Sequence, residues 1–284
     1  MIRCLKNELW ELFHNKLLLS ALLAGIGIVC IDMLQNYFLY LRYLNTYSDL
    51  SIRVGYNSIN LFNRWIAVNL DTVGYAWFFL LFPILAALPF GWSYCRDLNS
   101  GYLKQIMART TKNNYFLAKI VAIFLSGALV IGLPLLLDLL GSAMFLPATL
   151  PDVTGMQTPI WSGHFFSTLF YSHPWCYSFL AILTDMFWGG TIAVLALAVS
   201  CIKSYSLISI IFPFALFLIE DYMATTLFMS PSSTGNPLLL SPLALLHSAT
   251  VSPNPAWLVF GIMVLHLISS IIIIYFKGVK SETF

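Results

Sequence analysis

Residues Phe116–Leu137 read FLAKIVAIFLSGALVIGLPLLL, a run in which Lys119 is the only charged side chain. At a rise of 1.5 Å per residue, this run is long enough to cross the hydrocarbon core of a bilayer, which is about 30 Å thick. Backbone groups find no water to bond inside that core, so a spanning segment must pair its own N–H and C=O groups. The stretch therefore predicts a transmembrane helix.

Five further apolar runs extend this prediction to the whole chain. They lie around Leu17–Leu41, Val73–Tyr94, Trp175–Ser200, Leu207–Tyr222 and Ala256–Phe276. Only 9% of the 284 residues are charged, whereas a soluble domain carries about 25%. No stretch between the runs is long enough for an independent soluble domain. We expect an all-α polytopic membrane protein, with six transmembrane helices in one domain over residues 1–284.

Lysine and arginine are distributed unevenly between the two ends of these runs. Eleven lie on one side: Arg3, Lys6, Lys16, Arg96, Lys104, Arg109, Lys112, Lys119, Lys203, Lys277 and Lys280. The other side has three, Arg42, Arg53 and Arg64, and none in Asp138–Pro174 or Met223–Pro255. Because basic residues accumulate in cytoplasmic loops, both termini are expected to be cytoplasmic. A bacterial cytoplasmic membrane is the expected location.

Two segments outside the runs have their own patterns. In residues 1–15, Ile2, Leu5, Leu9, Leu12 and Phe13 fall on one helical face, which favours a helix lying in the membrane interface. A cytoplasmic helix packed on the bundle is the alternative. Residues 225–255 contain five prolines and the short apolar patch Leu238–Leu246. This patch is too short to span, so we expect an external re-entrant segment between helices five and six.

Several classes of function are disfavoured by what the sequence lacks. It has no phosphate-binding GxxxxGK[ST] loop, and Gly189 and Gly190 lie in an apolar run without a following lysine. Asp185 and His266 are ionisable residues deep in the runs, but no nucleophile motif accompanies them. The cysteines form no CxxC pair and the histidines no metal-ligand spacing. We therefore expect no catalytic site, no metal site, no cofactor in this chain and no nucleic-acid partner.

The loop at residues 95–115 has the most specific pattern. After Asp97 it continues Leu-Asn-Ser-Gly-Tyr-Leu-Lys-Gln-Ile-Met-Ala-Arg, ending at Arg109. Leu103, Ile106 and Met107 have helical spacing, beside exposed basic positions. The pattern favours a short amphipathic helix that is presented to the cytosol as a docking element. The alternative is that its basic residues only follow the positive-inside bias.

With this loop, the chain resembles the permease subunits of ABC exporters of the ABC-2 type. Those proteins combine an N-terminal interfacial "elbow" helix with six spans. Their first cytoplasmic loop has an acid, small residues and Gly, followed by Leu-Lys-x-Ile/Leu-x-x-Arg and later Tyr-x-x-x-Lys. The residues that match are Asp97, Gly101, Leu103, Lys104, Ile106, Arg109, Tyr115 and Lys119. Pro83–Gly91 and Ser241-Pro242-Leu243 also look family-like.

The resemblance implies a permease subunit that dimerises with a second copy or a paralogue. Each permease would receive a separate cytoplasmic ATPase subunit, which binds the ATP and Mg²⁺. The implied coupling residues are Asp97, Gly101, Tyr102, Leu103, Lys104, Ile106, Met107 and Arg109. The expected cargo is a hydrophobic or amphipathic peptide, such as a toxin or lantibiotic. The alternatives are a lipid-linked glycan, a drug-like amphiphile, or a membrane sensor or scaffold that transports nothing.

Acidic residues near the outer ends of the runs suggest a preference for cargo. Asp32, Asp138, Glu220 and Asp221 fall there, and acids within spans are costly and commonly functional. We hypothesise an outer acidic tier that favours a cationic, amphipathic substrate. The alternative is that these acids lie in the wet interface or pair with Arg42, Arg53 or Arg64. Asp185 either bonds to a polar neighbour or joins a proton relay, for which His266 is the second group.

Overall fold

The computed structural model describes residues 2–46, 59–151, 160, 164–228, 241–246 and 254–280. Every regular element in these ranges is helical, so the predicted all-α fold class is confirmed. The elements are α1 (Ile2–Phe13), α2 (Lys16–Thr46), α3 (Leu61–Arg64), α4 (Val73–Ala87), α5 (Ser93–Asn99), α6 (Tyr102–Met107), α7 (Lys112–Ser142), α8 (Ser167–Ser172), α9 (Pro174–Ile202), α10 (Ser206–Phe228), α11 (Pro242–Leu245), α12 (Ala256–Ile273) and the π-helical turn η1 (Ile274–Val279).

Five of these helices are long and apolar enough to cross a membrane, as in a multi-pass membrane protein. The qualifying segments are Lys16–Asn45, Lys112–Ser142, Pro174–Ile202, Ser206–Ala224 and Ala256–Val279. They correspond to five of the six predicted runs.

The remaining predicted run, Val73–Tyr94, is divided into two helices. Helix α4 has 15 residues, or about 22 Å of helix, and α5 begins at Ser93. Pro89 follows the end of α4 and has no N–H for the helical ladder. Its carbonyl instead accepts a 2.6 Å hydrogen bond from Asn15. A sixth span therefore stays a prediction, as does the re-entrant segment, most of which lies outside the described residues.

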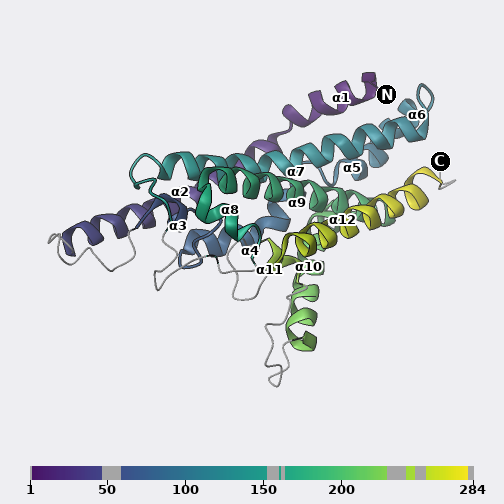
Figure 1. Cartoon of the computed structure of the whole chain (residues 1–284). Coiled ribbons are helices and arrows are strands. Elements are labelled where there is room, and N and C mark those ends of the chain that lie inside the picture. Colours follow the sequence, from purple (N-terminus) through teal and green to yellow (C-terminus); the bar gives the residue numbers. More distant parts are fainter. Residues whose placement is uncertain are drawn as a thin grey trace.

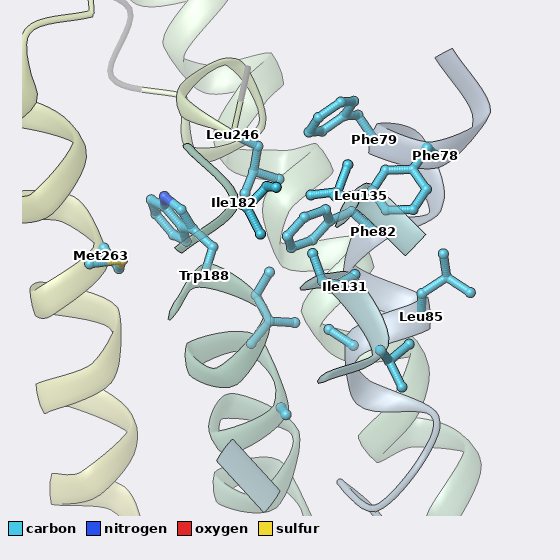
Figure 2. Close-up of a cluster of buried hydrophobic side chains, with 14 of the residues drawn as sticks. Phe78, Phe79, Phe82, Leu85, Ile131, Leu135, Ile182, Trp188, Leu246 and Met263 are labelled. Atoms are coloured by element: carbon cyan, nitrogen blue, oxygen red, sulfur yellow. The ribbon is translucent and has the colours of Figure 1, made fainter. Parts of the chain in front are cut away.

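Helices α7 and α9 form the centre of the bundle, and α4 packs against both. Gly127 on α7 and Gly189 on α9 allow this closeness, because a Cβ on Gly127 would overlap the Gly189 carbonyl. The buried cluster in Figure 2 joins four helices through these labelled side chains: Phe78, Phe79, Phe82 and Leu85 of α4, Ile131 and Leu135 of α7, Ile182 and Trp188 of α9, and Met263 of α12, beside Leu246. The short helix α4 is thus part of the core.

The two ends of the bundle carry different short helices. Figure 1 shows α1, α5, α6 and the C-terminal end of the chain at one end, with α3 and α8 toward the other. Lys104, Arg109 and Lys280 lie on or beside elements at the first end. The α1–α6 end is therefore the one that carries the basic residues expected on the cytoplasmic side.

Candidate functional site

The loop predicted as a docking element forms two short helices joined by a sharp turn. Gly101 connects α5 to α6 with a φ of 73°, a left-handed conformation that glycine adopts without steric cost. Leu103 lies on the buried face of α6, whereas Lys104 and Arg109 are exposed. Ile106 and Met107 are partly buried and pack against the core. Helix α6 and the turn after it thus present Lys104 and Arg109 to solvent at this end of the bundle.

Asp97 does not lie on that exposed side. It is 2% exposed, and its Oδ2 accepts hydrogen bonds from the Tyr115 hydroxyl at 2.6 Å and the Lys119 ammonium at 2.5 Å. Tyr115 and Lys119 are one turn apart on α7, so both reach the same carboxylate. Asp97 is therefore a positioning residue, which fixes the base of the loop to α7. Its predicted part in coupling to an ATPase stays a prediction.

Glu8 on α1 pairs with the same Lys119 ammonium that bonds to Asp97. Its Oε2 lies 3.0 Å from the Lys119 ammonium, and its side chain is only 3% exposed. Burial raises the pKa of Glu8, while the charge of Lys119 acts in the opposite direction. The Lys119 ammonium also lies 5.1 Å from the centre of the Phe90 ring, a distance at which the ring face attracts a cation.

Arg96 adds a second, more exposed link between α1 and α5. Its guanidinium pairs with Glu11 and lies 3.8 Å from Asp97. We call Glu8, Glu11, Arg96, Asp97, Tyr115 and Lys119 the elbow cluster. Ion pairs connect the N-terminal helix to the loop and to α7, and charge-assisted hydrogen bonds, which are stronger than neutral ones, connect the loop to α7. Movement of any one of these three elements must therefore strain the other two.

The sequence pattern identifies part of this cluster and misses part of it. Asp97, Tyr115 and Lys119 belong to the loop pattern of the ABC-2 resemblance. Glu8, in contrast, falls on the polar face of the first helix, which predicts that it is in water. The available signal is Lys119 itself, because a lysine within an apolar run needs a buried counter-ion.

Two clefts lie between α1 and the α5–α6 loop. One has a volume of about 690 Å³ and includes Trp10, Arg96 and Ser100 in its lining. The other has a volume of about 410 Å³ and includes Cys4, Ile106 and Arg109. Tyr102 and Gln105 line both. Helix α6 therefore borders two concave surfaces, both of which it shares with α1.

Trp10 and Phe13 show which side of α1 is left uncovered. Trp10 is 65% exposed and Phe13 60% exposed, whereas Leu12 is fully buried. Helix α1 packs on α7 through Glu8 and Leu12 and leaves two large aromatic side chains outward. Outward aromatic side chains suit a helix at a membrane interface, where tryptophan is enriched. Helix α1 also packs on α7, as the alternative of a helix packed on the bundle expects.

The four acids of the hypothesised outer tier divide into two separate groups. Asp32 and Asp138 are both 0% exposed. Asp32 accepts hydrogen bonds from Asn36 at 2.8 Å and from Thr72, and Asp138 accepts one from the backbone of Ile66 at 2.9 Å. These two carboxylates lie in the protein interior. Within the described ranges, no lysine or arginine side chain forms an ion pair with either.

Glu220 and Asp221 have partners on other helices. Asp221 accepts a 2.6 Å hydrogen bond from Ser241, which caps α11. Glu220 lies against His266 of α12. His266 is ten residues into α12, or about 15 Å from its start, so Glu220 is deeper than an outer tier requires. Asp185 is buried at 3% exposure, and its Oδ2 has no hydrogen-bond partner in the part of the chain that the structure describes.

No protein-family model, curated protein or solved structure matches this chain.

Proposed function

We propose that this chain is the membrane permease subunit of an ATP-driven exporter of the ABC-2 type. In this proposal both termini and the α5–α6 loop are cytoplasmic, and ATP and Mg²⁺ bind to separate ATPase subunits that dock on α6. The chain acts as a dimer with a second copy or a paralogue. The observation that carries the proposal is the elbow cluster, which fixes the α5–α6 loop to the central helix α7. We call the exposed face of this loop that carries Lys104 and Arg109 the docking ridge.

The elbow cluster supports coupling because it joins the docking ridge to the bundle core. A push on α6 acts on α5 through the Gly101 turn, and on α7 through the contacts of Asp97 with Tyr115 and Lys119. Helix α7 in turn meets α9 at Gly127 and Gly189, where the backbones touch. Since such packed interiors transmit displacement instead of absorbing it, closure of an ATPase would reach the helices of the transport path.

An amphipathic peptide is the cargo that we propose. Among the hypothesised acids, Glu220 keeps part of its side chain accessible, at 32% exposed. Asp32 and Asp138 are closed off and offer no cargo-facing oxygen in this conformation. Attraction for a cationic cargo is therefore assigned to Glu220 and its neighbour Asp221. A lipid-linked glycan and a drug-like amphiphile remain the alternative cargoes.

Purification of the full chain from its native membranes tests the proposal. The expected result is co-purification of a protein with a GxxxxGK[ST] motif and ATP hydrolysis by the complex. Lys104→Glu, on the docking ridge, should reduce the recovered ATPase by at least about tenfold. The reason is that an acidic surface that accepts Lys104 would then face a second negative charge, and like charges across an interface are strongly unfavourable. Lys203→Glu, also exposed at a helix end, is the matched control and should retain it. A partnerless chain would instead support the sensor or scaffold alternative.

A further inference from the structure

Helices α10 and α12 meet at a contact between two ionisable side chains. The Nε2 atom of His266 lies 3.3 Å from Oε1 and 3.2 Å from Oε2 of Glu220. The other ring nitrogen, Nδ1, lies 2.9 Å from the backbone carbonyl oxygen of Ile262. All three distances are those of hydrogen bonds or close ion pairs.

The Ile262 carbonyl determines where the protons of this contact must be. A carbonyl oxygen only accepts, so Nδ1 of His266 carries a hydrogen and donates it. In a neutral imidazole, Nε2 is then an acceptor, and an ionised Glu220 also only accepts. Two acceptors cannot bond to each other. The observed contact therefore requires one further proton, which lies either on Nε2 or on the Glu220 carboxyl.

The surroundings favour retention of that proton. His266 is 7% exposed, and the rings of Phe217 and Trp188 lie 5.5 Å and 6.2 Å from its own. The His266 side of the contact is therefore apolar, where an unpaired polar group is costly, whereas Glu220 is 32% exposed. Among the elements that pack on α10 and α12, other acids are Asp185 on α9, Asp221 on α10 itself and Asp97 on α5, whereas α4 and α11 carry none. Asp221 is bonded to Ser241.

We propose that Glu220 and His266 form a proton-binding site that joins α10 to α12 while it is occupied. The inference is independent of the proposed export function. When the proton leaves to water, a carboxylate faces the lone pair of Nε2, and the contact changes from a bond to a repulsion. Helix α10 can respond because only 22% of its spanning window is buried in the bundle. The site thus has two states, and pH selects between them.

Nitrogen-15 NMR of the histidines, with the full chain in lipid nanodiscs, tests this site directly. The chain has five histidines, and the spectrum of His266→Gln identifies which signal belongs to His266. In the wild type, the His266 signal should change between about pH 5 and about pH 8. In Glu220→Gln, an amide N–H replaces the shared proton, so the signal should remain that of an Nδ1-protonated neutral ring. Titration that is unchanged in Glu220→Gln would overturn the proposal.

A second measurement follows the helices and separates a proton site from a merely structural contact. Spin labels at Ile219→Cys and Leu265→Cys, both more than 60% exposed, report the distance between α10 and α12 after the native cysteines are replaced by alanine. The wild-type background should show a longer distance as the pH rises, while Glu220→Gln should stay short. Asp71→Asn, which removes a surface acid that is 77% exposed, is the control and should behave as wild type. A distance that is independent of pH in the wild type would contradict the proposed joining of helices.

Discussion

Lys119 and Glu8 form a 3.0 Å ion pair between α7 and α1, although both side chains are almost inaccessible to solvent. The pair attaches the first helix of the chain to a central one at the level of the α5–α6 loop. Asp97 shares the same ammonium. The predictions for this end of the molecule follow from the fact that one cation serves two buried carboxylates.

Replacement of Lys119 by methionine should destabilise the protein severely. It leaves Glu8 without its Lys119 counter-ion and Asp97 with only the more distant Arg96, and loss of one partner of a buried ion pair costs about 3–5 kcal/mol. The free energy of unfolding in lipid nanodiscs measures the effect. Lys104→Met, at an exposed position of α6, should change it by less than about 0.5 kcal/mol. Equal losses in the two variants would show that the elbow cluster contributes nothing special to stability.

The contribution of Glu8 to the free energy of unfolding should decrease as the pH rises, because burial raises the pKa of Glu8 above its ordinary value of 4.5 despite the nearby charge of Lys119. The folded state then binds this proton more tightly than the unfolded state does. The stability that the proton provides is complete below about pH 4.5 and is lost as the pH rises through the folded-state pKa. Unfolding free energies of wild type and Glu8→Gln should converge at low pH and separate above it, with Glu8→Gln the more stable. Parallel curves would contradict this.

The close approach of α7 and α9 should not tolerate a methyl group at Gly127. A Cβ there would overlap the Gly189 carbonyl and lie 2.8 Å from the Cβ of Ala193. Overpacking of this kind costs about 1–3 kcal/mol. Gly261→Ala is the matched control, since a Cβ at Gly261 would meet no described atom within 4 Å and alanine favours a helix. Thermal unfolding should move down for Gly127→Ala, while the control stays level or moves up. A similar shift in both would mean that the two backbones are not in contact.

The orientation of α6 should depend on the backbone of Gly101. Its φ is 73°, and a Cβ at this position would meet no described atom within 4 Å. The penalty for alanine therefore comes from the backbone alone and amounts to about 1–2 kcal/mol. Asparagine visits this conformation more readily. Hydrogen exchange in α6 should accelerate in the order Gly, Asn, Ala. Exchange rates that do not separate Asn from Ala would argue against a required left-handed turn.

Continuous apolar runs predicted the long helices closely, but they did not predict individual polar contacts. The run Trp175–Ser200 appears as α9, Pro174–Ile202, because helical pairing is the available way to satisfy its backbone in lipid. The run from Val73 to Tyr94 is divided after α4, where Pro89 ends the pattern that hydropathy alone extends. Hydropathy does not register that Pro89 lacks the N–H that a continuing helix needs. It also does not predict that the Pro89 carbonyl accepts its hydrogen bond from Asn15, which lies outside this run.

The candidate site was predictable only where one segment contained the signal. The loop pattern pointed to Asp97 and Lys119, but a helical wheel could not show that Glu8 faces α7 instead of water. The pair of Glu220 with His266 joins residues 46 positions apart on two different spans. No local period relates such positions, so their contact emerges only when the helices pack.

Photo-cross-linking from position 104 tests the central claim of coupling to an ATPase most directly. A photoreactive amino acid replaces Lys104 on the exposed face of α6 in the full chain, within native membranes, and a matched one replaces Lys203. A cross-link is expected from position 104, and little from position 203, to a polypeptide that contains a GxxxxGK[ST] motif, with a yield that changes when ATP is added. Equal cross-linking from both positions, or a product that contains no ATPase, would contradict it.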